Sequence, residues 1–263
     1  MCIRDSNYNP HTARLYTDIG LLTARPDFGE DATNLFNLLT GICQFQGMRQ
    51  LVVAPFDLHR RLLELIEREA ENARRGSPAR IIAKVNSLAE REIIEALYRA
   101  SAAGVKIDLI VRGVCCLRPG VPGVSENITV RSIVDRFLEH ARVYYFENAC
   151  QPEVFLGSAD WLPRNLFRRI ETVFPILDGL LRDRIINEVL ATPLADNVKA
   201  RVLFGDGTYQ RATRTDREPI RRSQTEFMAL ATAGPKLRGA AAKSRARYPR
   251  VELARPPYPP SKK

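Results

Sequence analysis

A histidine and a small-residue turn stand at the ends of two neighbouring strand-like segments. His140 precedes the apolar, aromatic run Val143–Phe146, and the run Val154–Leu156 leads into Gly157 and Ser158. Imidazole titrates close to neutral pH, which suits proton or phosphoryl transfer, and a turn of small residues exposes backbone N–H groups that can face an anion. If the two runs pair, the pattern indicates a phosphate-handling site. A surface hairpin with an incidental histidine fits the local pattern equally well.

A strand–helix–strand unit precedes this stretch and would help to position it. Arg80–Val85 is predicted as a strand, Leu88–Ala103 as a helix closed by Gly104, and Val105–Val111 as a second strand. Such a unit favours a parallel pair with a right-handed crossover. Arg112 follows at the carboxyl end of the second strand, which is the edge of an open α/β sheet where ligands bind.

Apolar periodicity and capping residues indicate the remaining elements. They are strand Leu15–Leu22, helix Gly29–Leu39, strand Leu51–Ala54, helix Leu58–Arg74 with Asp57 as N-cap, the short helix-like run Ser132–Leu138, strand Arg169–Ile176, helix Leu177–Leu190 and strand Val198–Phe204. This alternation predicts an α/β fold with a mixed, largely parallel sheet flanked by helices.

The composition favours a polyanionic partner and a reducing compartment. The formal net charge is +10 over 263 residues, which suits a nucleotide, a nucleic acid or a phosphate polymer. The five cysteines are odd in number and include no CxxC pair, so we expect reduced thiols in a cytoplasmic protein rather than disulfides or a zinc site. No apolar run reaches the roughly 18 residues of a transmembrane helix.

The two ends of the chain differ from its middle. Residues 213–263 form a basic stretch, rich in Lys, Arg, Gly, Ala and Pro towards its end, which predicts a disordered tail. Met1–Ser6 joins no periodic segment. Asn7-Tyr8-Asn9 echoes Asp160-Trp161-Leu162, and an arginine follows each copy. We therefore expect a duplicated catalytic half whose first copy lacks its upstream part.

Five long blocks, in this order, resemble the C-terminal part of bacterial polyphosphate kinases of the first type, a family of phospholipase D-like architecture. The blocks are NYNPHTARLYTDIGLLTA (7–24), VAPFDLHRRLLELIEREAENARRG (53–76), KVNSLAEREIIEALYRASAAGVKIDLIVRGVCCLRPG (84–120), SENITVRSIVDRFLEHARVYYFENA (125–149) and GSADWLPRNLFRRIETVFPI (157–176). The resemblance runs from Asn7 to about Tyr209.

The resemblance implies a two-lobed enzyme of which this chain holds a part. Residues 7–47 would be a remnant of the first C-terminal catalytic domain, residues 48–212 the second, phospholipase D-like domain, and residues 213–263 the tail. The family transfers the terminal phosphate of ATP reversibly to inorganic polyphosphate through a phosphohistidine. That histidine would lie upstream of this chain, so we expect the 263 residues alone to make no polyphosphate.

The resemblance also implies roles for three residues. Tyr16 would contact the nucleotide by stacking, Arg112 would bind phosphate oxygens, and His140 would assist phosphoryl transfer as acid or electrostatic partner. Mg²⁺ would act with ligands outside this chain, so no metal ligand is assigned here. The family further implies ATP and ADP as substrates, a homo-oligomer, and a cytoplasmic location, with a membrane-associated complex as an alternative.

Other basic residues are assigned by placement alone. His11 and His59 are interpreted as an incidental loop residue and a surface or packing residue. Arg136, Arg142 and Arg164 could line a phosphate path, because cationic side chains stabilise the oxygens of a transferring phosphoryl group.

Two alternative functions remain open at this point. A phospholipase D-like phosphodiesterase or nuclease is disfavoured because Arg142 stands where that superfamily usually has lysine. A non-enzymatic, basic polyanion-binding protein would bind in a salt-sensitive way, with little preference for ATP or polyphosphate over DNA. The leading hypothesis is a polyphosphate kinase, and for such an enzyme we expect no specific nucleic-acid partner.

Overall fold

The computed structural model describes residues 2–3 and 11–233. The chain falls into two compact units, Met1–Phe227 and Met228–Lys263. The terminal residues of the second unit, 234–263, and the predicted echo at residues 7–9 lie outside the described part. None of the described helices is long and apolar enough to cross a membrane.

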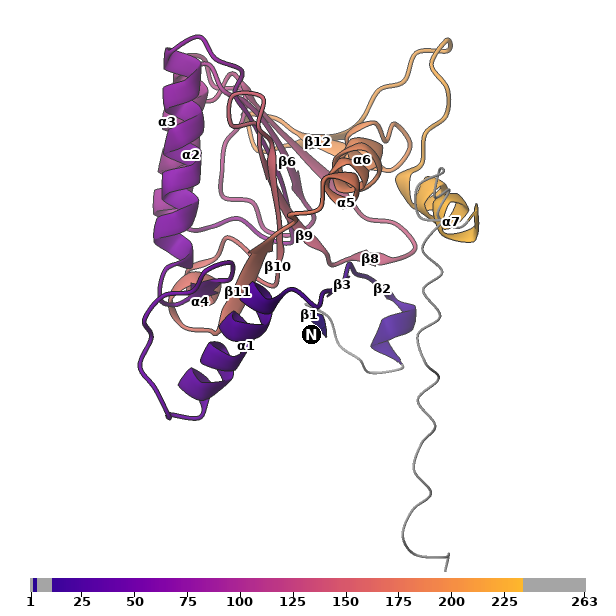
Figure 1. Ribbon diagram of the computed structural model, residues 1–263. Coiled ribbons are helices and arrows are strands. Elements are labelled where there is room, and N and C mark those ends of the chain that lie inside the picture. The colour runs from indigo at the N-terminus through magenta and orange to yellow at the C-terminus, as the bar shows by residue number, and fades with distance from the viewer. Residues whose placement is uncertain (1, 4–10, 234–263) are drawn as a thin grey trace, which may run out of the picture. The chain divides into compact units, whose positions relative to one another are not determined.

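A nine-stranded mixed sheet forms the centre of the first unit (Figure 1). Its order is β13-β12-β7-β6-β5-β9-β10-β11-β4. The strands are β4 (Val52–Ala54), β5 (Arg80–Val85), β6 (Lys106–Val111), β7 (Ile128–Ile133), β9 (Arg142–Phe146), β10 (Glu153–Gly157), β11 (Glu171–Pro175), β12 (Ala200–Leu203) and β13 (Tyr209–Arg211).

The mixed sheet is confirmed, but the prediction that it is largely parallel is wrong. Only the β5–β6 and β6–β7 pairs within this sheet are parallel. The other pairs are antiparallel. One reason is connectivity: β9 and β10 are joined by a short loop, which suits antiparallel strands, whereas parallel strands need a long crossover.

The predicted strand–helix–strand unit is present and in the expected register. β5 and β6 pair from Arg80↔Lys106 to Val85↔Val111. The helix between them, α3 (Arg91–Ala102), begins three residues later than predicted. The side chain of Glu90 caps it, because its carboxylate accepts hydrogen bonds from the backbone N–H groups of the first turn.

Helix α2 spans Leu58–Arg74 as predicted, but Asp57 does not cap it with its side chain. Its Oδ1 instead accepts a hydrogen bond of 2.7 Å from the backbone N–H of Val53. The carboxylate thereby fastens the end of β4 to the start of the helix.

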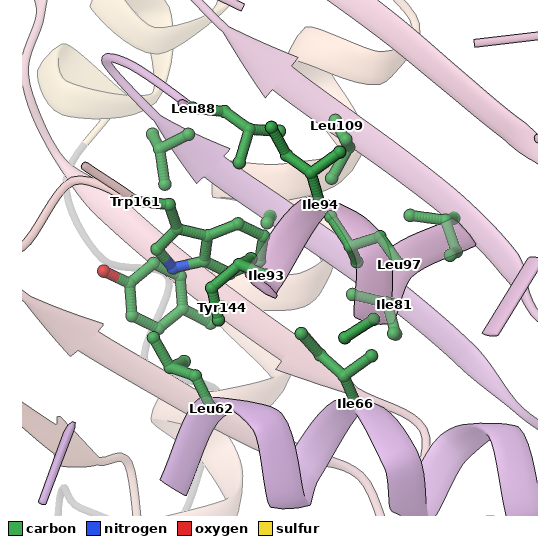
Figure 2. Close-up of a cluster of buried hydrophobic side chains, with 14 of the residues drawn as sticks. Leu62, Ile66, Ile81, Leu88, Ile93, Ile94, Leu97, Leu109, Tyr144 and Trp161 are labelled. Atoms are coloured by element: carbon green, nitrogen blue, oxygen red, sulfur yellow. The ribbon is translucent and has the colours of Figure 1, made fainter. Parts of the chain in front are cut away.

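Helices cover both faces of the sheet (Figure 1). α2 and α3 pack their leucines and isoleucines on one face, around the buried rings of Tyr144 and Trp161 (Figure 2). The other face receives Phe28 from α1 (Pro26–Leu39) and Ile185 and Leu190 from the helical run of α5 (Gly179–Arg184), η2 (Ile185–Leu190) and α6 (Ala191–Leu194). Strand β9 is buried on both faces.

Two short sheets and small helices complete the unit. Tyr16–Thr17 (β2) pairs in parallel with Leu138–Glu139 (β8), and Cys2–Ile3 (β1) pairs antiparallel with Leu21–Leu22 (β3). The small helices are η1 (Thr12–Arg14), α4 (Pro163–Phe167) and α7 (Ser223–Ala233), of which residues 223–227 belong to this unit.

Three sequence predictions about these segments are wrong. The predicted strand at residues 15–22 is divided into β2 and β3. The predicted helix-like run at 132–138 is the end of β7, a bend and the start of β8, because pairing with distant β2 overrides the local helical spacing. The tail predicted to be disordered from residue 213 contains α7, and Ser223 and Gln224 at its start are buried.

The loop between β9 and β10 offers a test of backbone strain. Asn148, Ala149 and Cys150 all adopt left-handed backbone angles, with φ of 48°, 51° and 68°. Alanine in this region costs about 1–2 kcal/mol, whereas glycine adopts it freely. We expect Ala149→Gly to raise the free energy of unfolding by about 0.5–1 kcal/mol in a urea titration, since glycine's added freedom in the unfolded chain offsets part of the gain.

The matched control is Ala103→Gly at the end of α3, where φ is −78°. No strain is relieved there, so this variant should be neutral or less stable. A loss of stability in Ala149→Gly would contradict the strain argument.

Candidate functional site

The pairing of β2 with β8 brings the N-terminal segment to His140. The backbone N–H of Leu138 donates to the carbonyl of Leu15 over 2.8 Å, and that of His140 donates to the carbonyl of Thr17 over 3.2 Å. The ring of Tyr16 stacks on the imidazole, with centroids 5.1 Å apart and planes inclined by 28°. Two of the three residues implied by the resemblance are therefore in direct contact.

Asp18 is a site residue that the sequence analysis missed. Its Oδ1 lies 3.2 Å from Nδ1 of His140, and its side chain is 7% exposed. The sequence holds one signal for Asp18. Residues i and i+2 of a strand lie on the same face, so a residue that contacts Tyr16 is expected to contact Asp18 as well.

Arg142 also contacts the imidazole, with its Nη1 3.3 Å from Nδ1 of His140, and it is fixed by a buried ion pair. Its Nε and Nη2 contact the two oxygens of Asp160 at 3.2 and 3.1 Å. Both side chains are less than a tenth exposed. Its Nη1 donates to the carbonyl of His140 over 3.0 Å and lies 3.1 Å from the imidazole Nε2. Asp160 also accepts a 2.7 Å hydrogen bond from the backbone N–H of Asn86.

Arg112 reaches the same region through Asn86. Its Nε donates to Oδ1 of Asn86 over 3.0 Å, and Nδ2 of Asn86 is 3.4 Å from the carbonyl of His140. Gly113 follows, and its N–H donates to the Asn86 carbonyl over 2.7 Å. A Cβ at Gly113 would stand 2.9 Å from that carbonyl oxygen, so the close approach of the two strand ends requires glycine.

A buried ion pair lies beside the backbone of the His140 strand. Nζ of Lys84 is 3.2 Å from Oε2 of Glu139 and donates to the carbonyl of Ala141 over 3.1 Å. Lys84, Glu139 and Arg112 line a cavity of about 10 Å³. A space of that volume holds at most about one water molecule.

The described contacts of the Gly157-Ser158 turn contradict the prediction that it faces an anion. The N–H of Ser158 donates to the carbonyl of Thr172 over 3.0 Å, and its hydroxyl hydrogen-bonds to Glu171. A Cβ at Gly157 would stand 2.6 Å from Cγ2 of Val173. The turn therefore fastens β10 to β11, and the N–H of Ser158 is used for this and not for a ligand.

The other basic residues considered in the sequence are not joined to His140 by the described contacts. His59 contacts Glu90 at 3.3 Å and packs on the ring of Phe167, which agrees with a packing role. Arg136 lies over the ring of Phe137, and Arg164 is exposed on α4. His11 is exposed. In the described residues, no group of three or more His, Cys, Asp or Glu side chains could hold a metal ion.

The arrangement is suited to proton transfer beside a phosphate. The imidazole stands between a carboxylate, which can fix its tautomer, and a guanidinium, which can stabilise negative charge. Arg142 is itself held by its buried ion pair with Asp160, which fixes the guanidinium beside the imidazole.

Two family models match the chain. The model described as "Polyphosphate kinase C-terminal domain 2" matches residues 51–224, and "Polyphosphate kinase C-terminal domain 1" matches residues 1–45.

Relatives and a solved structure agree with these models. The polyphosphate kinase of Synechocystis sp. is 50% identical over 88% of this chain and 32% of its own length. That of Burkholderia ambifaria is 56% identical over 78% of this chain and 30% of its own length. The crystal structure of polyphosphate kinase from Porphyromonas gingivalis superposes with a TM-score of 0.84 and 41% identity, over 88% of this chain and 35% of that one. The chain thus spans about a third of the relatives it matches, and it belongs to the polyphosphate kinase family.

Proposed function

We propose that this chain forms the His140 side of a phosphoryl-transfer site that takes ATP or ADP and inorganic polyphosphate. The observation that carries the proposal is the arrangement of His140 between Asp18 and Arg142, with Tyr16 stacked on the imidazole. The relatives named polyphosphate kinase support the choice of substrates.

His140 would act on the transferring phosphoryl group as a general acid or as a cationic partner. Asp18 would accept a hydrogen bond from Nδ1–H and so leave Nε2 to act on a phosphoryl oxygen. Arg142, 3.1 Å from Nε2, would stabilise the negative charge that builds on that oxygen. The phosphohistidine nucleophile would come from the upstream part of the enzyme.

Tyr16 and Arg112 would hold the nucleotide. One face of the Tyr16 ring is covered by His140, so the other face would stack on the base. The Nε of Arg112 is anchored on Asn86, and its two Nη groups have no partner among the described residues. A planar fork of donors held in this way suits phosphate oxygens.

The family also suggests a setting for the site. Its Mg²⁺ would be held by ligands from another part of the enzyme, because no group of three or more His, Cys, Asp or Glu side chains among the described residues could hold a metal ion. The unmatched gap between residues 45 and 51 supports a domain boundary near residues 47 and 48. We infer a homo-oligomer and a cytoplasmic location from the family alone.

Arg112→Ala tests the nucleotide site directly. We expect the dissociation constant for ADP, measured by titration calorimetry on the 263-residue chain, to rise about 10- to 100-fold, which is the effect of losing one charge-assisted contact. Arg164→Ala, an exposed arginine outside the site, is the matched control and should bind as the parent does.

Two results would count against the proposed function. One is equal ADP affinity in the parent and in an Arg112→Ala, His140→Ala double variant. The other is that DNA at equal phosphate concentration displaces bound polyphosphate. Binding would then also weaken strongly as salt is added, as expected for a non-specific basic surface. The second result would favour a polyanion-binding protein, as the net charge of +10 permits.

A further inference from the structure

The backbone just before His140 is bound by the side chain of Gln224, a residue far along the chain. Oε1 of Gln224 accepts a 2.8 Å hydrogen bond from the N–H of Phe137, and its Nε2 donates to the carbonyl of Phe137 over 2.9 Å. The same Nε2 donates to Oε1 of Glu139 over 2.9 Å. The Gln224 side chain is almost fully buried.

This contact imitates a missing strand. In an antiparallel pair, a residue exchanges both its N–H and its C=O with one residue opposite. β2 pairs with β8. The side-chain amide of Gln224 makes both of these hydrogen bonds to Phe137, as a residue of a second neighbouring strand would. A two-residue strand is weak alone, so its position depends on such contacts.

Gln224 is itself held in place by the residues before it. Arg222 binds Asp135 through two hydrogen bonds of 2.7 and 2.6 Å, and the N–H of Ser223 donates to Oδ2 of Asp196 over 2.7 Å. The hydrogen bonds from Arg222 lower the pKa of the Asp135 carboxyl. Residues 222–224 thus lie against the loop that leads into β8.

The contact continues beneath the strand. Glu139 uses one carboxylate oxygen for Gln224 and the other for Lys84 of β5. A buried chain of three side chains, Gln224, Glu139 and Lys84, therefore joins the start of α7 to the central sheet. It passes directly beside His140.

We propose that Gln224 is a positioning residue for His140. Its amide fixes the backbone of Phe137 and the carboxylate of Glu139, sets the position of β8 against β2, and so keeps the imidazole between Asp18 and Arg142. The catalytic meaning of this role rests on the proposed function, whereas the positional role does not.

Amide hydrogen exchange on the 263-residue chain measures the positional role. In Gln224→Met, which keeps the length but loses all three hydrogen bonds, protection of the Leu138 and His140 amides should fall about 10- to 100-fold. Protection of Ile82 in the central strand β5 should stay unchanged. Thr225→Ala, one residue on and exposed, is the matched control and should leave all three amides as in the parent.

The imidazole provides a second readout that general destabilisation does not mimic. The ring ¹⁵N shifts of His140 should move in Gln224→Met, because its distances to Asp18 and Arg142 change, while those of His59 stay in place. Gln224→Glu keeps one acceptor but sets a carboxylate against Glu139, so it should move His140 at least as far.

Unchanged protection at Leu138 and His140, or an equal loss at Ile82, would overturn the proposal. Calorimetry with ADP on the same samples separates it from the proposed function. If the parent fails to bind ADP while the exchange and shift changes occur, the proposed function fails and the positioning role stands.

Discussion

Arg142→Met is expected to lower the free energy of unfolding by about 3–5 kcal/mol. The guanidinium and the Asp160 carboxylate are both buried and joined by two hydrogen bonds. Removing the arginine leaves a buried carboxylate with one described donor, the backbone N–H of Asn86. An unpaired buried charge is costly, because the low-dielectric interior replaces its hydration poorly. Urea titration followed by the fluorescence of the single, buried Trp161 would measure the loss.

A surface pair and a double variant show whether burial is the cause. Arg25 and Asp27 form a similar two-bond pair with Arg25 57% exposed, so Arg25→Met should cost far less than Arg142→Met, because solvent screens the exposed pair. The double variant Arg142→Met, Asp160→Leu removes both charges and should recover much of the stability. Equal losses in Arg142→Met and Arg25→Met would refute the argument.

The same pair explains how stability and function are joined at this site. Asp160 holds the backbone of Asn86 and the side chain of Arg142, Asn86 orients Arg112, and Arg142 lies against His140. The buried Asp160 carboxylate therefore fixes Arg142 directly and Arg112 through Asn86. Arg142→Met should for this reason also weaken ADP binding.

Local signals made much of the fold predictable from sequence. The helix Leu58–Arg74 and the strand Arg80–Val85 have the predicted bounds, because apolar spacing and the Gly76-Ser77-Pro78 break act within a few residues. Strand β6 begins one residue from its predicted start. The predicted start of α3 is three residues early, because Glu90 supplies the cap.

The site was less predictable because its contacts are long-range. The pairing of Tyr16 with Leu138 and the hydrogen bonds of Gln224 to Phe137 join segments that no short window contains. The run 132–138 was predicted to be helix-like, yet it forms the end of β7, a bend and the start of β8 between distant partners. Tyr16, Arg112 and His140 were named through a family resemblance, whereas Asp18 carries no motif of its own and required the β2–β8 pairing to be seen.

Trp161→Ala is expected to destabilise the protein by about 3–5 kcal/mol, the usual loss for a large aromatic side chain removed from a core. The indole is fully buried and packs on the ring of Tyr144 at 5.4 Å between centroids (Figure 2). Its backbone carbonyl also accepts hydrogen bonds from the N–H groups of Ala89 and Glu90, at the start of α3. The cavity left by alanine would loosen the residue next to Asp160, so the loss should come with weaker ADP binding.

Trp161→Phe separates shape from hydrogen bonding. Although the indole Nε1 is buried, it has no hydrogen-bond partner among the described residues. A phenyl ring loses some packing area but removes an unsatisfied donor, whose burial costs about 1–3 kcal/mol, so this variant should lose less than about 1.5 kcal/mol.

Circular dichroism must follow the unfolding, since both variants lack the only tryptophan. Phe167→Ala, at an exposed ring, should change little. If Trp161→Phe were as unstable as Trp161→Ala, the indole N–H would have to be bound, for example by a buried water, and packing alone would not explain why tryptophan stands beside Asp160.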